Sequence, residues 1–293
     1  MMKVRFLSHT EAVREFATST YLKSHSPDEA KLKLLRYCNG YSPDIPLYDQ
    51  LLRCYTSKII PFSSEEKAIL KYYFKLLFAR LNRKAPLLLP NKQTVGLIQI
   101  DYGVDWNAPF TINHSIVISE MTMSSMKKAY IYFRQTGRCK KVKRNLATLC
   151  HEFAHIIQRY PKLYPKQHQI FDHAYKHWGF VPITKPLDWS QVDMKKFFSL
   201  RTNPDGAQFQ WMYPLRGKMY MPIFGEVGGD EKYMGRLDGA LVQVLPEKDR
   251  IVVTNNLDYT KNFNEYINRF YGRDEQIYHP QEIMAVYLCN AMV

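Results

Sequence analysis

Residues 145–160, NLATLCHEFAHIIQRY, decide how the rest of the chain is interpreted. Apolar residues recur here at the spacing of one buried helical face, and Pro161 follows where the pattern ends. These apolar positions are Leu146, Leu149, Cys150, Phe153, Ile156 and Ile157. The spacing therefore predicts a helix with one face in the core.

The predicted helix contains the pattern H-E-x-x-H, formed by His151, Glu152 and His155. Four residues advance a helix by slightly more than one turn, so both imidazoles lie on one side and can bind a single metal ion. Glu152 lies beside them as the candidate general base, because its carboxylate can take a proton from a zinc-bound water. The motif predicts a zinc site. The alternative is a core helix with two hydrogen-bonded, metal-free histidines on its polar side.

Composition indicates a folded globular protein, since 46% of the 293 residues are hydrophobic and 14% are aromatic. The chain contains no run of eighteen apolar residues, and the apolar patch at its start is broken by Ser8, His9 and Glu11. We therefore expect neither a signal peptide nor a membrane anchor, and a cytoplasmic or virion-associated location. The five cysteines are scattered and form no C-x-x-C pair, so we expect reduced thiols.

The balance of charge is strongly basic, with 41 Lys and Arg against 27 Asp and Glu, a net charge of +14. Such a field attracts anionic partners, and we expect nucleic acid rather than a membrane as the candidate partner. The densest cluster contains Arg138, Lys140, Lys141, Lys143 and Arg144. We interpret this cluster as a solvated loop in preference to a surface that binds bases, because no aromatic residues interleave with these cations.

The pattern along the chain predicts an α+β fold in which an N-terminal helical region, residues 1–85, precedes a catalytic domain, residues 86–293. Ser8 with Glu11 and Ser63 with Glu66 form capping boxes, and Pro27 begins a further helix. Short apolar runs predict strands. They occupy residues 87–89, 95–100, 116–118, 208–224 and 240–254, and a last helix is expected over 263–271. Residues 101–119 are the candidate rim of a cleft, where an edge strand pairs with an extended substrate.

Two residues compete for the position of third metal ligand. His168 follows His155 by thirteen residues, and its H-x-x-x-F pattern resembles the H-G-x-x-F element of SprT-like proteases, which cleave DNA–protein crosslinks, with Gln169 in place of the glycine. A surface helix with solvent-facing histidines explains that stretch equally well. Glu282 lies in the predicted first turn of a helix that Pro280 begins, and two His with one Glu is a known zinc ligand set.

Three segments of the chain resemble a poorly characterised family of bacterial and phage zinc metallopeptidases. The segments are HEFAH at 151–155, TNPD at 202–205 and YHPQEIMA at 278–285, and the similarity spans about residues 105–292. The resemblance implies a zincin-like catalytic domain with a gluzincin-like site, in which His151, His155 and Glu282 bind zinc and Glu152 is the base. It also implies substrate-binding roles for Asn203 and Asp205.

The neighbourhood of Glu282 supplies further candidates. Tyr278 and His279 are close to it in sequence, so either could donate a hydrogen bond to the oxyanion of the tetrahedral intermediate. Capping or packing is the alternative role for each. Gluzincins often carry an acidic residue one turn after the ligand Glu, where this chain has Val286 and Tyr287. We therefore expect another residue, with Asp205 as the candidate, to orient a ligand histidine.

These observations predict a zinc-dependent metallopeptidase acting on a protein or peptide, and they specify no oligomeric state. Two alternatives stay open: a SprT-like protease acting on DNA-bound proteins, and a non-catalytic zinc-binding structural or virion protein. The SprT-like alternative requires His168 rather than Glu282 as the third ligand. The structural alternative predicts bound zinc without hydrolysis.

Overall fold

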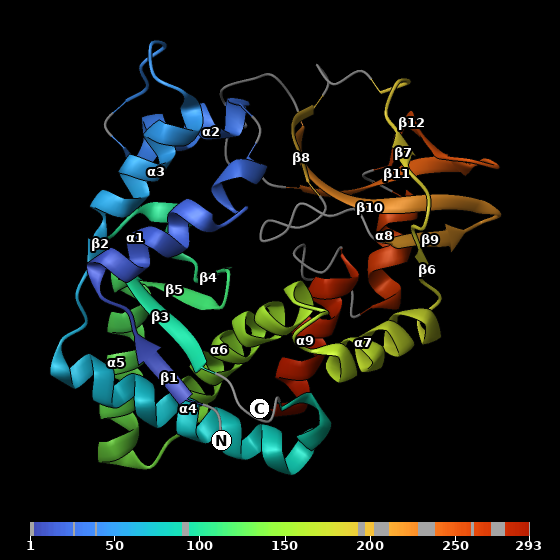
Figure 1. Ribbon diagram of the computed structural model, residues 1–293. Helices are drawn as coiled ribbons and strands as arrows, with labels where there is room; N and C mark the ends of the chain where they lie inside the picture. The colour runs from blue at the N-terminus through green and yellow to red at the C-terminus, as the bar shows by residue number, and fades with distance from the viewer. Residues whose placement is uncertain are drawn as a thin grey trace. The chain divides into compact units, whose positions relative to one another are not determined.

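The computed structural model (Figure 1) describes residues 3–25, 27–38, 40–89, 94–192, 197–201, 211–227, 238–258, 261–270 and 279–292. The chain divides into two compact units. Unit 1 comprises Met1–Lys23, Lys33–Gln169 and Ala285–Val293, and unit 2 comprises Ser24–Leu32 and Ile170–Met284. Each unit has a sheet with helices, which confirms the mixed α+β class.

Unit 1 is built on a sheet in which the strands lie in the order β1 (Lys3–Phe6), β3 (Thr94–Ile100), β5 (Ser115–Ser119) and β4 (Phe110–Ile112), visible in Figure 1. β2 (Ile59–Ile60) pairs with β3 off this path. β1, β3 and β5 are parallel, whereas β4 is antiparallel to β5 and ends the order. β3 and β5 are buried almost throughout, as expected of parallel strands covered on both faces.

Helices cover both faces of this sheet. The ring of Phe110 packs against Phe16 of α1 (His9–Thr18) and Tyr55 of α3 (Leu47–Ser57). The next residue, Thr111, hydrogen-bonds to Glu152 of α6 (Lys140–Arg159). Because successive side chains in a strand point to opposite faces, α1 and α3 lie on one side of β4 and α6 lies on the other.

Two helices, α4 and α5, form one layer with α6. The Tyr73 hydroxyl of α4 (Ser64–Lys84) donates to the Met126 carbonyl of α5 (Glu120–Thr136) at 3.2 Å. The same hydroxyl accepts a hydrogen bond from the side-chain amide of Asn145 in α6 at 3.2 Å. One buried tyrosine thus ties α4, α5 and α6 together.

Several local predictions are confirmed. Ser8 with Glu11 begins α1 and Ser63 with Glu66 begins α4, each as a complete capping box. α2 (Pro27–Tyr37) begins at Pro27, as expected. α4 buries the apolar face that its periodicity indicates, formed by Ile69, Leu70, Tyr73, Phe74, Leu77 and Leu81.

Other predictions are wrong. Residues 3–6 and 59–60, expected to be helical, are β1 and β2, because pairing with β3 overrides their local preference. Residues 87–89, expected to be a strand, belong mostly to the 3-10 helix η2 (Pro86–Leu88), which Pro86 begins. Further 3-10 helices are η1 (Leu22–Ser24) and η3 (Val104–Asn107).

The expectation of reduced thiols is wrong for two of the five cysteines. Cys38, just after α2, and Cys54, in α3, form a disulfide, with their Cα atoms 5.5 Å apart. Packing of α2 and α3 brings the two side chains together, which scattered positions in the sequence could not reveal. Cys139, Cys150 and Cys289 are free.

Unit 2 contains a second sheet with the strands in the order β6 (Val181–Pro182), β9 (Trp211–Leu215), β10 (Lys218–Val227), β11 (Asp238–Pro246), β12 (Ile251–Asp258) and β7 (Leu187–Asp188), and β8 (Phe197–Arg201) pairs with β10. The turn Arg216-Gly217 joins β9 to β10 with positive φ at both residues, as a tight hairpin requires. Strands predicted over 208–224 and 240–254 are confirmed from residue 211 onward, while 208–210 lie outside the described residues.

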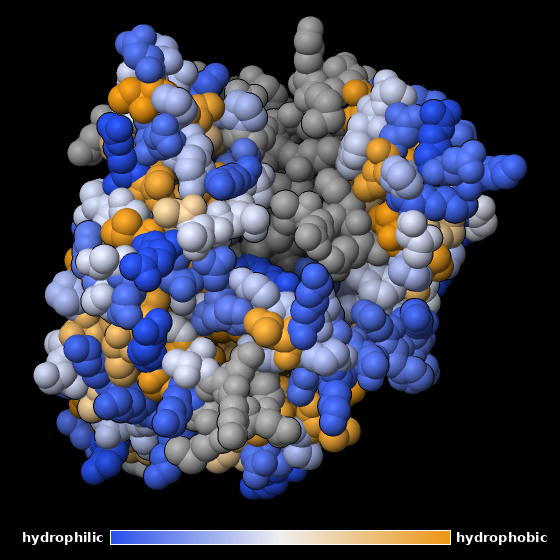
Figure 2. Space-filling model, viewed as in Figure 1, coloured by the Kyte–Doolittle hydropathy of each residue, from blue (hydrophilic) through white to orange (hydrophobic). Residues whose placement is uncertain are grey.

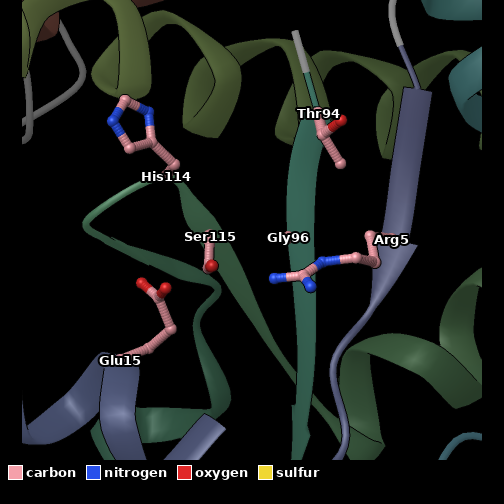
Figure 3. Close-up of a pocket in the computed structure, with 6 residues that line it drawn as sticks. All are labelled: Arg5, Glu15, Thr94, Gly96, His114 and Ser115. Carbon is pink, nitrogen blue, oxygen red and sulfur yellow. The ribbon is translucent and has the colours of Figure 1, made fainter. Parts of the chain in front are cut away.

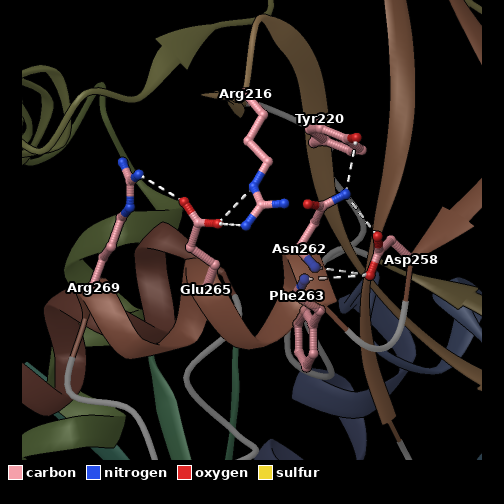
Figure 4. A network of polar contacts seen from close by, with 7 residues as sticks. All are labelled: Arg216, Tyr220, Asp258, Asn262, Phe263, Glu265 and Arg269. Atoms are coloured by element: carbon pink, nitrogen blue, oxygen red, sulfur yellow. Dashed lines mark hydrogen bonds and ion pairs between the residues drawn. The ribbon is translucent and has the colours of Figure 1, made fainter.

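Polar contacts fix α8 (Lys261–Arg269) at both ends (Figure 4). The Asp258 carboxylate accepts hydrogen bonds from the backbone N–H groups of Asn262 and Phe263 and so caps the helix start. Glu265 accepts from Arg216 in the β9–β10 turn and from Arg269 one turn later. These contacts hold the hairpin turn against the helix.

α7 (Pro165–His177) and α9 (Pro280–Met292) complete the described helices. Within the part of the chain that the structure describes, no helix combines the length and apolar character needed to cross a bilayer.

Candidate metal centre

α6 carries both histidines of the motif, and its sequence explains why they face the interior. Leu146, Leu149, Phe153, Ile156 and Ile157 are all buried, so the helix lies deep in unit 1. His155 is 1% exposed and His151 is half-buried. The Nε2 atoms of the two rings lie 2.9 Å apart, so both nitrogens point to the same place. This is the arrangement that the i, i+4 spacing predicts.

Glu282 completes the group. The ligand atoms of His151, His155 and Glu282 all lie within 4.8 Å of one another, and the Glu282 side chain is buried at 6% exposure. Two imidazole nitrogens and one carboxylate are a donor set that zinc accepts in catalytic sites, with further coordination positions left over. These three residues could therefore hold a metal ion.

The packing of α9 on α6 explains how residues so distant in sequence meet. In unit 1, the Cys289 thiol of α9 donates to the Ala147 carbonyl of α6 at 3.0 Å. Glu282 precedes Cys289 by seven residues and His151 follows Ala147 by four, distances of about 10 and 6 Å along the two helix axes. Antiparallel packing with this register carries Glu282 toward the two histidines.

Gln158 orients His155 and was not predicted. Its side-chain oxygen lies 2.8 Å from His155 Nδ1 and is itself buried at 4% exposure. An amide oxygen accepts hydrogen bonds, so Nδ1 carries the proton and the lone pair is on Nε2, the atom that faces the group. The sequence contained a signal for this role, because i+3 on a helix is adjacent to i. Asp205, the residue expected in this role, lies outside the described residues.

Thr111 orients Glu152 and was also missed. Its hydroxyl donates to Glu152 Oε2 at 2.8 Å, and Thr111 is fully buried. Glu152 is 4% exposed, so this hydrogen bond satisfies a carboxylate oxygen that has little access to water. Thr111 lies 41 residues before Glu152 on β4, so only the fold brings the two side chains together.

His168 does not join the group among the described residues. Its Nε2 lies 2.8 Å from the Ile157 carbonyl, which can only accept, so this nitrogen carries a proton. The contact ties α7 to the end of α6. Of the two candidates for the third ligand, the geometry favours Glu282.

His279 precedes α9 and caps it. Its backbone carbonyl accepts from the Ile283 N–H at 2.9 Å, and its Nδ1 accepts from the Gln281 N–H at 3.2 Å. With Nδ1 as acceptor, the neutral ring carries its proton on Nε2. The other predicted residues of the site, Tyr278, Asn203 and Asp205, lie outside the described residues.

A cavity of about 290 Å³ lies elsewhere in unit 1, and none of its lining residues belongs to the metal group (Figure 3). The lining residues are Arg5, Glu15, Thr94, Gly96, His114 and Ser115. Arg5, Gly96 and Ser115 form one row across β1, β3 and β5. Burial lowers the pKa of His114, whose ring stacks on Tyr160 at 3.9 Å, so the imidazole is neutral at pH 7.

Neither a protein-family model, nor a curated protein, nor a solved structure matches this chain. The case for function therefore depends on the geometry of the site.

Proposed function

We propose that this protein is a zinc-dependent metallopeptidase with a gluzincin-like site. The observation that carries the proposal is the convergence of His151, His155 and Glu282, together with a buried carboxylate, Glu152, that follows His151 directly in the H-E-x-x-H motif. A buried carboxylate beside three candidate ligands is the chemistry that hydrolysis needs, because one group must accept a proton where water is activated.

Each residue of the site has a role in this proposal. Zinc, when bound by His151, His155 and Glu282, would supply Lewis acidity at this site. Glu152, held by Thr111, accepts the proton of the attacking water at its carboxylate and passes it to the leaving amine. Gln158 holds His155 in the tautomer that presents Nε2. His279 and Tyr278 are the candidate donors to the oxyanion.

The position of β4 supports a peptide as the substrate. Among the described strands, β4 is the last in the order β1-β3-β5-β4 and so lies at an edge of the sheet. Its Thr111 hydroxyl donates a hydrogen bond to Glu152, the proposed base. An edge strand can pair with an extended peptide through backbone hydrogen bonds. A peptide bound along β4 would pass next to Glu152, and residues 101–119 would form the rim of the cleft.

The substitution Glu152→Gln tests the proposal. It keeps the shape of the side chain but removes its basicity, so we expect zinc to remain bound while cleavage of an unfolded protein substrate falls by about 10²- to 10⁴-fold. Glu120→Gln, on an exposed glutamate at the start of α5, is the matched control and should leave cleavage unchanged. Zinc content by elemental analysis accompanies both assays.

Two outcomes would overturn the proposal. Full activity of the Glu152→Gln variant would show that Glu152 is not the general base. Bound zinc without cleavage of any unfolded substrate by the wild-type protein would assign the site a structural role instead.

A further inference from the structure

Two segments of unit 1, which lie mostly in three helices, carry a large excess of cations. Residues 67–84 and 121–150 contain fourteen Lys and Arg and no Asp or Glu. The rest of the chain holds 27 Lys and Arg, which balance all 27 Asp and Glu. These two segments cover most of α4, most of α5, and the first half of α6. These two segments therefore form a strongly cationic part of unit 1.

The cations reach solvent from helices that pack together. Tyr73 joins α4, α5 and α6 by hydrogen bonds, and Tyr72 of α4 lies with its ring 5.0 Å from that of Tyr130 of α5. On the face shown in Figure 2, hydrophilic residues are interspersed with apolar ones over α4. We define the basic surface by the exposed cations around this contact. They are Lys71, Lys75, Lys128, Arg134, Arg138, Lys140, Lys141 and Arg144.

Within the protein, little compensates this charge. Lys127 pairs with Glu65, but no member of the basic surface forms an ion pair with a carboxylate of the described residues. Lys140 and Arg144 are four residues apart on α6, a spacing at which like charges repel. They also lie at the helix start, where the first turn has no acidic residue and the Cys139 side chain makes no cap. Cations are unfavourable at this positive end of a helix, so the fold tolerates a local electrostatic cost.

Tyrosines lie among these cations, supplied by a neighbouring helix. The Nζ of Lys141 lies 5.4 Å from the centre of the Tyr132 ring, and an Arg138 nitrogen lies 3.4 Å from the Tyr132 hydroxyl. Tyr132 is half-buried, so part of its ring is accessible. Aromatic residues are absent from 138–144 in sequence, but α5 brings Tyr132 beside them. Cations next to accessible aromatic rings are typical of surfaces that bind phosphates and stack on bases.

We propose that the basic surface binds nucleic acid through its phosphate backbone, with Tyr132 as a stacking position for a base. We favour nucleic acid over an anionic membrane, because the half-buried Tyr132 adds a contact that bases use. The binding has no requirement for the metal site, although Arg144 and His151 share one helix and lie about 10 Å apart along its axis.

Fluorescence anisotropy with a labelled oligothymidylate of about 20 nucleotides tests the proposal on the full-length protein. The variant Lys140→Gln, Lys141→Gln, Arg144→Gln removes three cations of the basic surface. The variant Lys162→Gln, Lys166→Gln, Lys176→Gln removes three exposed cations outside it and leaves the same net charge. We expect the first variant to bind at least about tenfold more weakly at low salt, and the second to bind like the wild type.

Salt dependence gives a second readout. Each lost phosphate contact lowers the slope of log affinity against log salt by about 0.7 on a single strand, so the first variant should show a slope shallower by about 2. Equal loss in both triple variants would overturn the proposal, since the effect would then follow net charge alone. Binding to phosphatidylserine vesicles without binding to the oligonucleotide would also overturn it.

Two further variants separate this proposal from others. Tyr132→Leu should weaken oligonucleotide binding without changing the salt slope, because it removes a stacking contact and no charge. Glu152→Gln should bind like the wild type, so loss of the proposed peptidase activity leaves this inference intact. Circular dichroism should show the helix content of the wild type in both triple variants, because the cations that they substitute are exposed.

Discussion

Gln158 is the residue on which the orientation of His155 depends. The amide oxygen accepts the Nδ1 proton at 2.8 Å and leaves the lone pair of Nε2 for a metal ion. Gln158→Leu should weaken zinc affinity by about 10- to 100-fold, measured by competition with a chromogenic chelator. Gln167→Leu is the matched control, because Gln167 is also buried and donates to the Leu87 carbonyl. Equal zinc affinity in both variants would contradict the role of Gln158.

Lys33 and Asp105 form a buried ion pair in which Asp105 also accepts hydrogen bonds from the hydroxyls of Tyr21 and Tyr55. Lys33→Met leaves the carboxylate buried without its cation, so the free energy of unfolding should fall by about 3–5 kcal/mol in denaturant titrations. Lys58, which faces Asp101 at 3.8 Å on the partly exposed surface, provides the comparison.

Lys58→Met should lower the free energy of unfolding by less than about 1 kcal/mol, because solvent already screens that pair. Similar losses for the two substitutions would show that burial of the Lys33–Asp105 pair does not govern its contribution.

At this scale the sequence identified the candidate ligands but not the residues that hold them. His151 and His155 follow from a fixed spacing on one helix, and Glu282 from a resemblance supported by Pro280. Thr111 could not be predicted, because its contact with Glu152 depends on how β4 packs on α6. The contact of Gln158 with His155 could have been predicted, because residues three apart on a helix are neighbours.

At the scale of the elements, the row formed by Arg5, Gly96 and Ser115 shows how close packing of β3 and β5 restricts side-chain size at one position. A Cβ built on Gly96 would lie 2.2 Å from Ser115 Oγ and 3.1 Å from Ser115 Cβ. Gly96→Ala should therefore lower the melting temperature, with a cost of about 1–3 kcal/mol for overpacking. Adding Ser115→Gly moves the glycine to the neighbouring strand and should recover most of the loss. Failure of that rescue would indicate that the backbone of β3 itself requires glycine.

The disulfide between Cys38 and Cys54 links the end of α2 to α3. It closes a loop of about 15 residues, so the double variant Cys38→Ser, Cys54→Ser should lose about 3 kcal/mol of stability. A reducing agent should lower the melting temperature of the wild type but not of the variant. An unchanged wild-type melting temperature on reduction would show that this link is not formed in solution.

Elements whose pattern is complete within one segment were predictable, and elements that depend on a partner were not. α6 is predicted by its apolar spacing, α4 by its apolar spacing and its capping box, and β3 and β5 by their apolar runs. β1 is four residues long and half-exposed, so its identity comes from pairing with β3. The apolar run after Pro86 forms a 3-10 turn in which only Leu88 is buried, and a run of this composition is equally compatible with a strand.

At the scale of the whole molecule, the candidate metal ligands come from the middle and the end of the chain. Binding of an ion to His151, His155 and Glu282 stabilises only states in which α6 and α9 are folded together. Metal affinity therefore adds to the free energy of unfolding. A free zinc concentration about 1,000 times the dissociation constant should add about 4 kcal/mol.

This linkage predicts which variants lose zinc-dependent stabilisation in thermal unfolding of chelator-treated protein. Glu282→Gln should remove most of the zinc-induced rise in melting temperature, because it eliminates the ligand that α9 supplies. His168→Ala should keep the full rise even if the variant is less stable without metal, since His168 Nε2 donates to the Ile157 carbonyl. Loss of the rise in His168→Ala but not in Glu282→Gln would identify His168 as the third ligand and favour the SprT-like alternative. Comparing each variant with and without zinc separates loss of a ligand from loss of a structural contact, because only a ligand changes the difference between the two curves.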